Sequence, residues 1–97
     1  MKIQTVGVVG AGTMGNGIAQ VFAGSNFKVI LFDINNEQLE KGLNTISGSL
    51  DRIVKKEKIT EAQKQATLDN IQTTTSLDDF SDVELVVEAA KIGRAHV

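Results

Sequence analysis

Cysteine, proline, tryptophan and tyrosine are absent from this chain of 97 residues, and its one histidine is His96. Without cysteine the chain forms neither disulfides nor thiolate metal ligands. The short apolar run near the N-terminus lacks a signal-peptide cleavage pattern, and together with the missing cysteine this favours a cytoplasmic protein. No apolar run approaches the length of a membrane span.

A surplus of positive charge is also missing. Ten Lys and Arg stand against 12 Asp and Glu, which gives a formal net charge of -2. This balance leaves no excess to neutralise a nucleic-acid backbone or an anionic membrane surface, so we expect neither as a partner. The 41% of hydrophobic residues suffices for the modest core of one small domain.

The first third of the chain predicts a strand, a turn, a helix and a second strand. Residues 3–9 form a β-branched run that ends in Gly-Ala-Gly, which is typical of a strand buried on both faces. Apolar residues recur at helical spacing over residues 14–25, and residues 27–32 form a second apolar run that ends at Asp33. This stretch has the size of a βαβ unit with a right-handed crossover.

The middle of the chain predicts two further helices. Asn35 or Asn36 can cap the first, and Thr60-Glu61-Ala62-Gln63 is a capping box that starts the second, which ends near Asn70. An ordinary crossover needs only one helix, so the pair predicts a helical hairpin inserted between the second and third strands. The apolar positions of the first of these helices recur at steps of four and three: Leu39, Leu43, Ile46, Leu50 and Ile53.

The rest of the chain predicts two short strands, at residues 71–75 and 83–87, with one helical turn capped by Ser76 between them. The expected fold is therefore α/β, a partial Rossmann-type parallel sheet of order 3-2-1-4 that occupies residues 1–90. The fourth strand would lie at an apolar, unpaired edge, from which we expect poor solubility.

Residues 10–15 carry the pattern G-x-G-x-x-G. Gly10 permits the tight turn, Gly12 lets the backbone approach a pyrophosphate, and Gly15 lets the helix pack closely on the strand. The helix that begins here offers free N–H groups and a positive dipole end to phosphates. The alternative is that these glycines form only a turn, but this does not explain why the pattern lies directly between a predicted strand and a predicted helix. The predicted cofactor loop consists of Gly10, Ala11, Gly12, Thr13, Met14 and Gly15.

Asp33 is a second, independent indication of a dinucleotide site. It ends the second predicted strand, about 20 residues after the loop, where a carboxylate binds the adenosine ribose 2′-OH. A carboxylate repels a 2′-phosphate, and residues 34–36 supply no arginine to receive one. The sequence therefore predicts NAD rather than NADP.

Taken together, residues 6–20, the strand end at Asp33, the helical hairpin and Val86-Val87-Glu88-Ala89-Ala90 resemble the NAD-binding domain of 3-hydroxyacyl-CoA dehydrogenases. The resemblance implies hydride transfer between NAD and C3 of a 3-hydroxyacyl-CoA, in fatty-acid or butanoate metabolism. It also implies a homodimeric full-length protein. Its catalytic histidine and glutamate would lie beyond residue 90, so no catalytic residue is assigned in this chain.

The same resemblance implies that the hairpin contacts the acyl-CoA substrate through Ser49 and Lys56. These residues are seven positions apart, which places them on one stripe of a helix. A hydroxyl and an ammonium group on one stripe suit a nucleotide phosphate. The alternative is a solvated face shared with Asp51, Arg52 and Lys55.

The tail, residues 91–97, departs from the family's pattern, which has a glutamate where Ile92 stands. The tail is identical to the translation of a common short-read sequencing adapter. We interpret it as adapter sequence and the chain as a fragment that is inactive alone; a short protein that ends naturally here is the alternative. In this interpretation His96 has no role.

Two other functions stay open on the sequence. Another NAD-dependent dehydrogenase, of the 3-hydroxyisobutyrate or glycerol-3-phosphate type, would share the first βαβ unit but usually lacks a capped hairpin such as that at residues 36–70. A non-catalytic NAD-binding module would share the glycine loop, since binding a dinucleotide is not catalysis.

Overall fold

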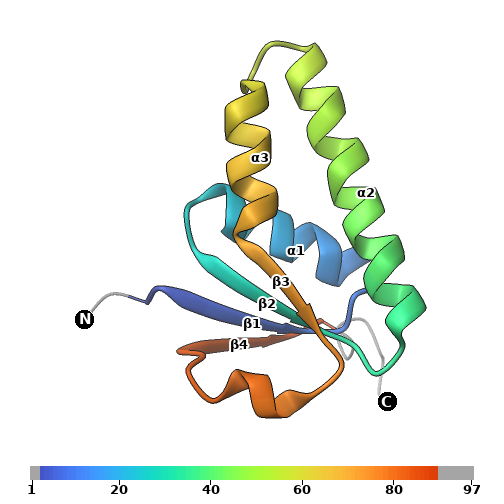
Figure 1. Cartoon of the computed structure of the whole chain (residues 1–97), viewed down its shortest axis with the longest axis vertical. Coiled ribbons are helices and arrows are strands. Elements are labelled where there is room, and N and C mark those ends of the chain that lie inside the picture. The colour runs from blue at the N-terminus through green and yellow to red at the C-terminus, as the bar shows by residue number, and fades with distance from the viewer. Residues whose placement is uncertain (1–2, 90–97) are drawn as a thin grey trace, which may run out of the picture.

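The computed structural model describes residues 3–89, which form one four-stranded parallel sheet in the order β3-β2-β1-β4 (Figure 1). The elements are β1 (Thr5–Val9), α1 (Thr13–Gly24), β2 (Lys28–Phe32), α2 (Asn36–Lys55), α3 (Glu61–Asp69), β3 (Ile71–Thr74), the 3₁₀ turn η1 (Leu77–Phe80) and β4 (Leu85–Glu88). The predicted Rossmann-type order and the inserted hairpin are confirmed. The interpretation of residues 91–97, His96 included, lies outside the described residues.

The central strand β1 determines where the predicted cofactor site lies. It pairs with β2 and with β4, in a register that sets Val9 beside Phe32 on one side and beside Glu88 on the other. Because all three strands run in the same direction, the segments that follow them leave the sheet at one edge. The glycine loop and Asp33 therefore start side by side.

The core lies between the sheet and the helices. Successive side chains of a strand point to opposite faces, and every second residue of β1 and β2 faces the helices. Burial of these aliphatic side chains, together with those from α1 and α2, holds the layers together. The core residues that are at most 1% exposed are Val6, Val8, Ala11, Ala19, Ala23, Val29, Leu31 and Ile46.

Residues 3–89 cover the opposite face of the sheet only in part. The Phe80 ring of η1 lies over Gly7, where an added Cβ would come within 2.7 Å of the ring, and it meets the Phe32 ring edge-on at 6.2 Å. Val86 pairs with Gly7 on this face yet is 50% exposed. Among the described residues β4 pairs with β1 alone, as the predicted edge requires. Poor solubility stays a prediction.

Two helices end on residues in the left-handed region. After α1, Asn26 has φ of 71°, and the Phe27 N–H donates to the Phe22 carbonyl at 3.1 Å. The same two aromatic rings meet edge-on at 5.4 Å, which is the apolar contact of a Schellman motif. After α2, Glu57 has φ of 60°, although the sequence offers no glycine or asparagine there.

The helical hairpin rises from the sheet as two antiparallel helices (Figure 1). Asn35 is its N-cap, with a side chain that accepts the Glu37 N–H at 2.8 Å, which decides between the two predicted caps. The capping box at Thr60 is present as predicted. An ion pair between Asp51 of α2 and Lys64 of α3 joins the two helices, and its hydrogen bond raises the pKa of Lys64.

The first and fourth strands are shorter at their starts than predicted. The Glu84 carboxylate accepts the N–H groups of Gln4, at 2.7 Å, and Thr5, at 3.1 Å, where a strand would have used backbone partners. The Val83 N–H donates to the Phe80 carbonyl and so belongs to the preceding turn. The N–H groups of Gln4, Thr5 and Val83 thus bond to a side chain or within a turn, and the strands begin at Thr5 and Leu85.

Candidate cofactor site

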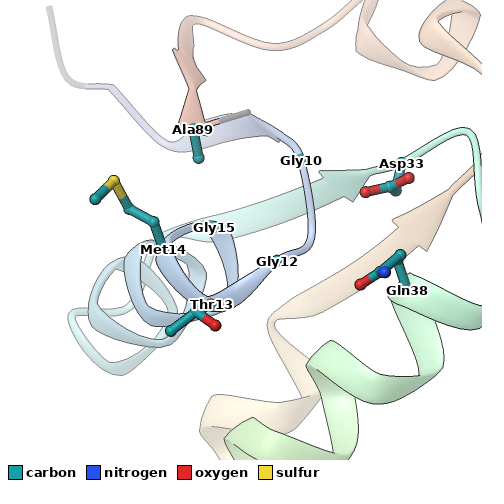
Figure 2. Close-up of a pocket in the computed structure, with 8 residues that line it drawn as sticks. All are labelled: Gly10, Gly12, Thr13, Met14, Gly15, Asp33, Gln38 and Ala89. Atoms are coloured by element: carbon teal, nitrogen blue, oxygen red, sulfur yellow. The ribbon is translucent and has the colours of Figure 1, made fainter. Parts of the chain in front are cut away.

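A pocket of about 370 Å³ opens at the carboxyl edge of the sheet. Figure 2 shows Asp33 and Gln38 on one side of the glycine loop, and Met14 and Ala89 on the other. The residues that line it are Gly10, Gly12, Thr13, Met14, Gly15, Asp33, Gln38 and Ala89. The structure therefore brings the predicted loop and Asp33 together. Ala11 alone of the predicted loop does not line the pocket, because its side chain is buried.

The three glycines of the loop differ in surroundings. Gly10 has φ of 102°, a conformation that L side chains rarely adopt, and its N–H donates to the Phe32 carbonyl at 2.7 Å. A Cβ at Gly15 would lie 1.6 Å from the Gly10 carbonyl oxygen, so α1 touches the loop backbone here. A Cβ at Gly12 would meet nothing within 4 Å. The space beside Gly12 is therefore open to a ligand.

The start of α1 forms the floor of the pocket. Gly12 is its N-cap and supplies no side-chain cap, and the first helical hydrogen bond runs from the Asn16 N–H to the Gly12 carbonyl at 2.9 Å. The N–H groups of the first turn therefore have no partner inside the helix. No acidic residue lies in this turn. Free donors and the positive dipole end suit a phosphate group.

Asp33 lies half-buried at the mouth of the pocket, and both of its carboxylate oxygens accept backbone hydrogen bonds. Oδ2 accepts the Ala11 N–H at 3.0 Å, and Oδ1 accepts the Asn35 N–H at 2.9 Å. An ionised carboxylate has about four acceptor positions. About two remain for the hydroxyl groups of a ligand.

Gln38 and Ala89 line the pocket but were not among the predicted site residues. Gln38 lies in the first turn of α2, which starts at the same edge of the sheet as Asp33. Ala89 directly follows β4, the neighbour of β1. The expected strand order was the signal for Ala89, since it places the end of the fourth strand beside the loop. The predicted cap at Asn35 could have indicated Gln38, because it places this residue in the first turn of the helix that starts beside Asp33.

The structure does not bring Ser49 and Lys56 into this pocket. Ser49 is half-buried on α2, where its Oγ accepts a hydrogen bond from Gln20 Nε2 of α1 at 3.2 Å. Lys56 is exposed and is the C-cap of α2, one residue beyond the helix in which the stripe was expected. The helix ends there because Glu57 takes a positive φ. Both residues lie on the hairpin, away from the cofactor pocket. A contact between them and an acyl-CoA substrate stays a prediction.

Neither a metal site nor a membrane helix is found among residues 3–89. No group of three or more His, Cys, Asp or Glu side chains within this range could hold a metal ion. The helices of the same range are too short or too polar to cross a membrane.

A parallel sheet of order 3-2-1-4, with a glycine loop and a free helix start at its carboxyl edge, defines a Rossmann-type dinucleotide-binding domain. The family model described as "3-hydroxyacyl-CoA dehydrogenase, NAD binding domain" matches residues 5–91. The chain belongs to this family, and NAD is the cofactor of its domain. The family match favours this assignment over the two other dehydrogenase types left open by the sequence.

Similar proteins support the same assignment. A 3-hydroxybutyryl-CoA dehydrogenase from Bradyrhizobium diazoefficiens is 47% identical over 88 residues, which are 91% of this chain and 30% of that protein. The crystal structure of (S)-3-hydroxybutyryl-CoA dehydrogenase from Ralstonia eutropha matches with a TM-score of 0.88 and 50% identity, over 91% of this chain and 31% of that one. A lactate dehydrogenase from Cryptosporidium parvum, at 22% identity and a TM-score of 0.61, covers 95% of this chain and 27% of its own and shares the fold alone. The chain thus spans about 30% of the length of the curated 3-hydroxybutyryl-CoA dehydrogenases that it matches.

Proposed function

We propose that residues 1–90 are the first part of the NAD-binding domain of a longer, NAD-dependent 3-hydroxybutyryl-CoA dehydrogenase. The observation that carries the proposal is the pocket in which the glycine loop, the free start of α1 and Asp33 meet. Its substrate class comes from the names of the relatives at 47% and 50% identity. The proposed protein is a cytoplasmic homodimer of fatty-acid or butanoate metabolism.

Bound NAD supplies the position that accepts a hydride from C3 of the 3-hydroxyacyl group. The first-turn N–H groups of α1 hold the pyrophosphate, and the space beside Gly12 lets it approach. The remaining acceptor positions of Asp33 bind the adenosine ribose, and its charge disfavours a 2′-phosphate. The proton on the substrate hydroxyl is taken by a base beyond residue 90, so these residues bind and orient rather than react.

A chimera tests this function. Residues 1–89 of this chain would replace the matching segment of the Ralstonia eutropha enzyme, whose fold they share. We expect the chimera to oxidise 3-hydroxybutyryl-CoA with NAD and much more slowly with NADP, whereas the chain alone shows no turnover. NADH formation measures the result. A folded chimera that binds NAD but oxidises no acyl-CoA would contradict the proposed substrate. It would favour the alternative function, a non-catalytic NAD-binding module.

We also propose that Lys56, with Ser49, binds a phosphate group of coenzyme A. Lys56 is fully available for this role because it is exposed at the end of α2. In the chimera, Lys56→Ala should raise the KM for the acyl-CoA roughly twofold to fivefold, which is the effect of losing an exposed ion pair. The control is Lys41→Ala, an exposed lysine of the same helix. Equal KM values for the two variants would support the solvated-face alternative.

Residues 91–97 are proposed to be translated sequencing adapter rather than protein sequence. The identity of all seven residues supports this origin. A second sequencing of the locus should find a reading frame that continues differently after Ala90. A native stop codon after Val97 would contradict it.

A further inference from the structure

Ala11 is held on both sides of its backbone. Its N–H donates to Asp33 Oδ2 at 3.0 Å. Its carbonyl oxygen faces α2, where a Cβ added at Gly42 would come within 3.0 Å of it. The Ala11 side chain is 1% exposed and lies 3.7 Å from the same Cβ position. The middle of the glycine loop therefore fits between a carboxylate and a helix backbone.

Asp33 extends this contact to the start of α2. Its other oxygen accepts the N–H of Asn35 at 2.9 Å, and Asn35 is the residue that caps α2. One carboxylate thus joins the loop, the end of β2 and the first turn of the hairpin. All of these contacts are made by the chain's own backbone and side chains.

We propose that Asp33 and Gly42 are positioning residues that clamp Ala11 and so fix the glycine loop in its binding conformation. The inference rests on the proposed NAD site and adds a role for Asp33 beyond the ribose. Holding a loop residue in one conformation costs conformational entropy. If the loop is already ordered by folding, cofactor binding does not have to order it. This is the advantage of a preorganised site.

The role of Asp33 in the clamp can be separated from its role toward the ribose. Asp33→Asn keeps the size of the side chain but replaces one acceptor oxygen with an NH₂ donor. Whichever way the amide turns, one of the two backbone N–H groups then faces a donor. A NAD analogue without the 2′ and 3′ hydroxyls of the adenosine ribose cannot use the ribose contact. It can therefore detect a change in the loop alone.

The experiment measures the affinity of the full chain and of its Asp33→Asn variant for NAD and for this dideoxy analogue, by calorimetry. We expect the variant to bind the analogue roughly tenfold or more weakly than the unchanged chain does, because a hydrogen bond to a charged group is lost. Equal affinity for the analogue, with weakened binding of NAD, would overturn the clamp and leave the NAD site standing. An unchanged chain that binds neither compound would instead refute the proposed site.

A second measurement needs no ligand. The Ala11 amide should exchange its hydrogen roughly tenfold or more faster in the Asp33→Asn variant, because the bond that protects it is gone. An unchanged exchange rate at Ala11 would overturn the proposal even where no cofactor binds.

Gly42 is tested against a second glycine of α2. A Cβ at Gly48 would find its nearest neighbour, the Arg52 guanidinium, at 4.0 Å, so Gly48→Ala changes the helix without touching the loop. Gly42→Ala should weaken NAD binding several-fold by displacing the Ala11 carbonyl, while Gly48→Ala should leave it unchanged. Equal affinities of the two variants for NAD would remove Gly42 from the clamp.

Discussion

Gly15→Ala is expected to lower the free energy of unfolding by about 3 kcal/mol or more. The added methyl would lie 1.6 Å from the carbonyl oxygen of Gly10 and 2.7 Å from its carbonyl carbon. Both atoms belong to the backbone directly after β1, in a residue whose φ of 102° already depends on glycine. No side chain can rotate away to make room, so α1 would have to separate from the loop.

Chemical denaturation of the full chain measures this loss, and Gly17→Ala is the matched control. Gly17 lies two residues further along α1, and a Cβ there meets nothing within 4 Å. This control should stabilise the chain by about 0.5–1 kcal/mol, since alanine favours the helix over glycine. Similar stabilities for the two variants would show that α1 does not contact the loop backbone closely at Gly15.

Gly12→Ala is expected to leave the fold intact and to weaken NAD binding roughly 10-fold to 100-fold. The backbone at Gly12, with φ of -68°, accepts any L residue, and the methyl would enter open space. This is the space in which we place the pyrophosphate, beside the free N–H groups of α1. Loss of one hydrogen bond to a charged group, worth about 1.5–3 kcal/mol, accounts for the range.

Calorimetry with NAD and thermal unfolding without it measure the two halves of this prediction. Gly24→Ala serves as the control, because that glycine is also free of neighbours within 4 Å but lies at the far end of α1. A Gly12→Ala variant that folds and binds NAD as tightly as the control would place the pyrophosphate elsewhere.

Local patterns explain why so much of this fold could be predicted. The capping box at Thr60 and the cap at Asn35 depend on residues three or fewer positions apart, which the sequence displays directly. The strand order followed from right-handed crossovers and the glycine loop. The sequence predicted no end for α2, because Glu57 adopts a positive φ without being the glycine or asparagine that usually marks such a turn.

Contacts between distant residues explain what could not be predicted. Gly7 lies under Phe80, and Gly42 lies against Ala11, and in each case the reason for glycine is a partner far away in the sequence. An isolated glycine inside a strand is a general sign of close approach, but it does not name the residue that approaches. The same holds for Asp33, whose position in the chain indicated a ribose contact but not the Ala11 N–H that it accepts.

The order of the strands also has a consequence for how the protein is made. Among the residues that the structure describes, seven of those that line the cofactor pocket lie between Gly10 and Gln38, and Ala89 follows much later in the chain. β1 and β2 are therefore able to pair on the ribosome, with the glycine loop between them, long before β4 is translated. The translation of β4 then adds Ala89 to a pocket whose other described lining residues are already in place.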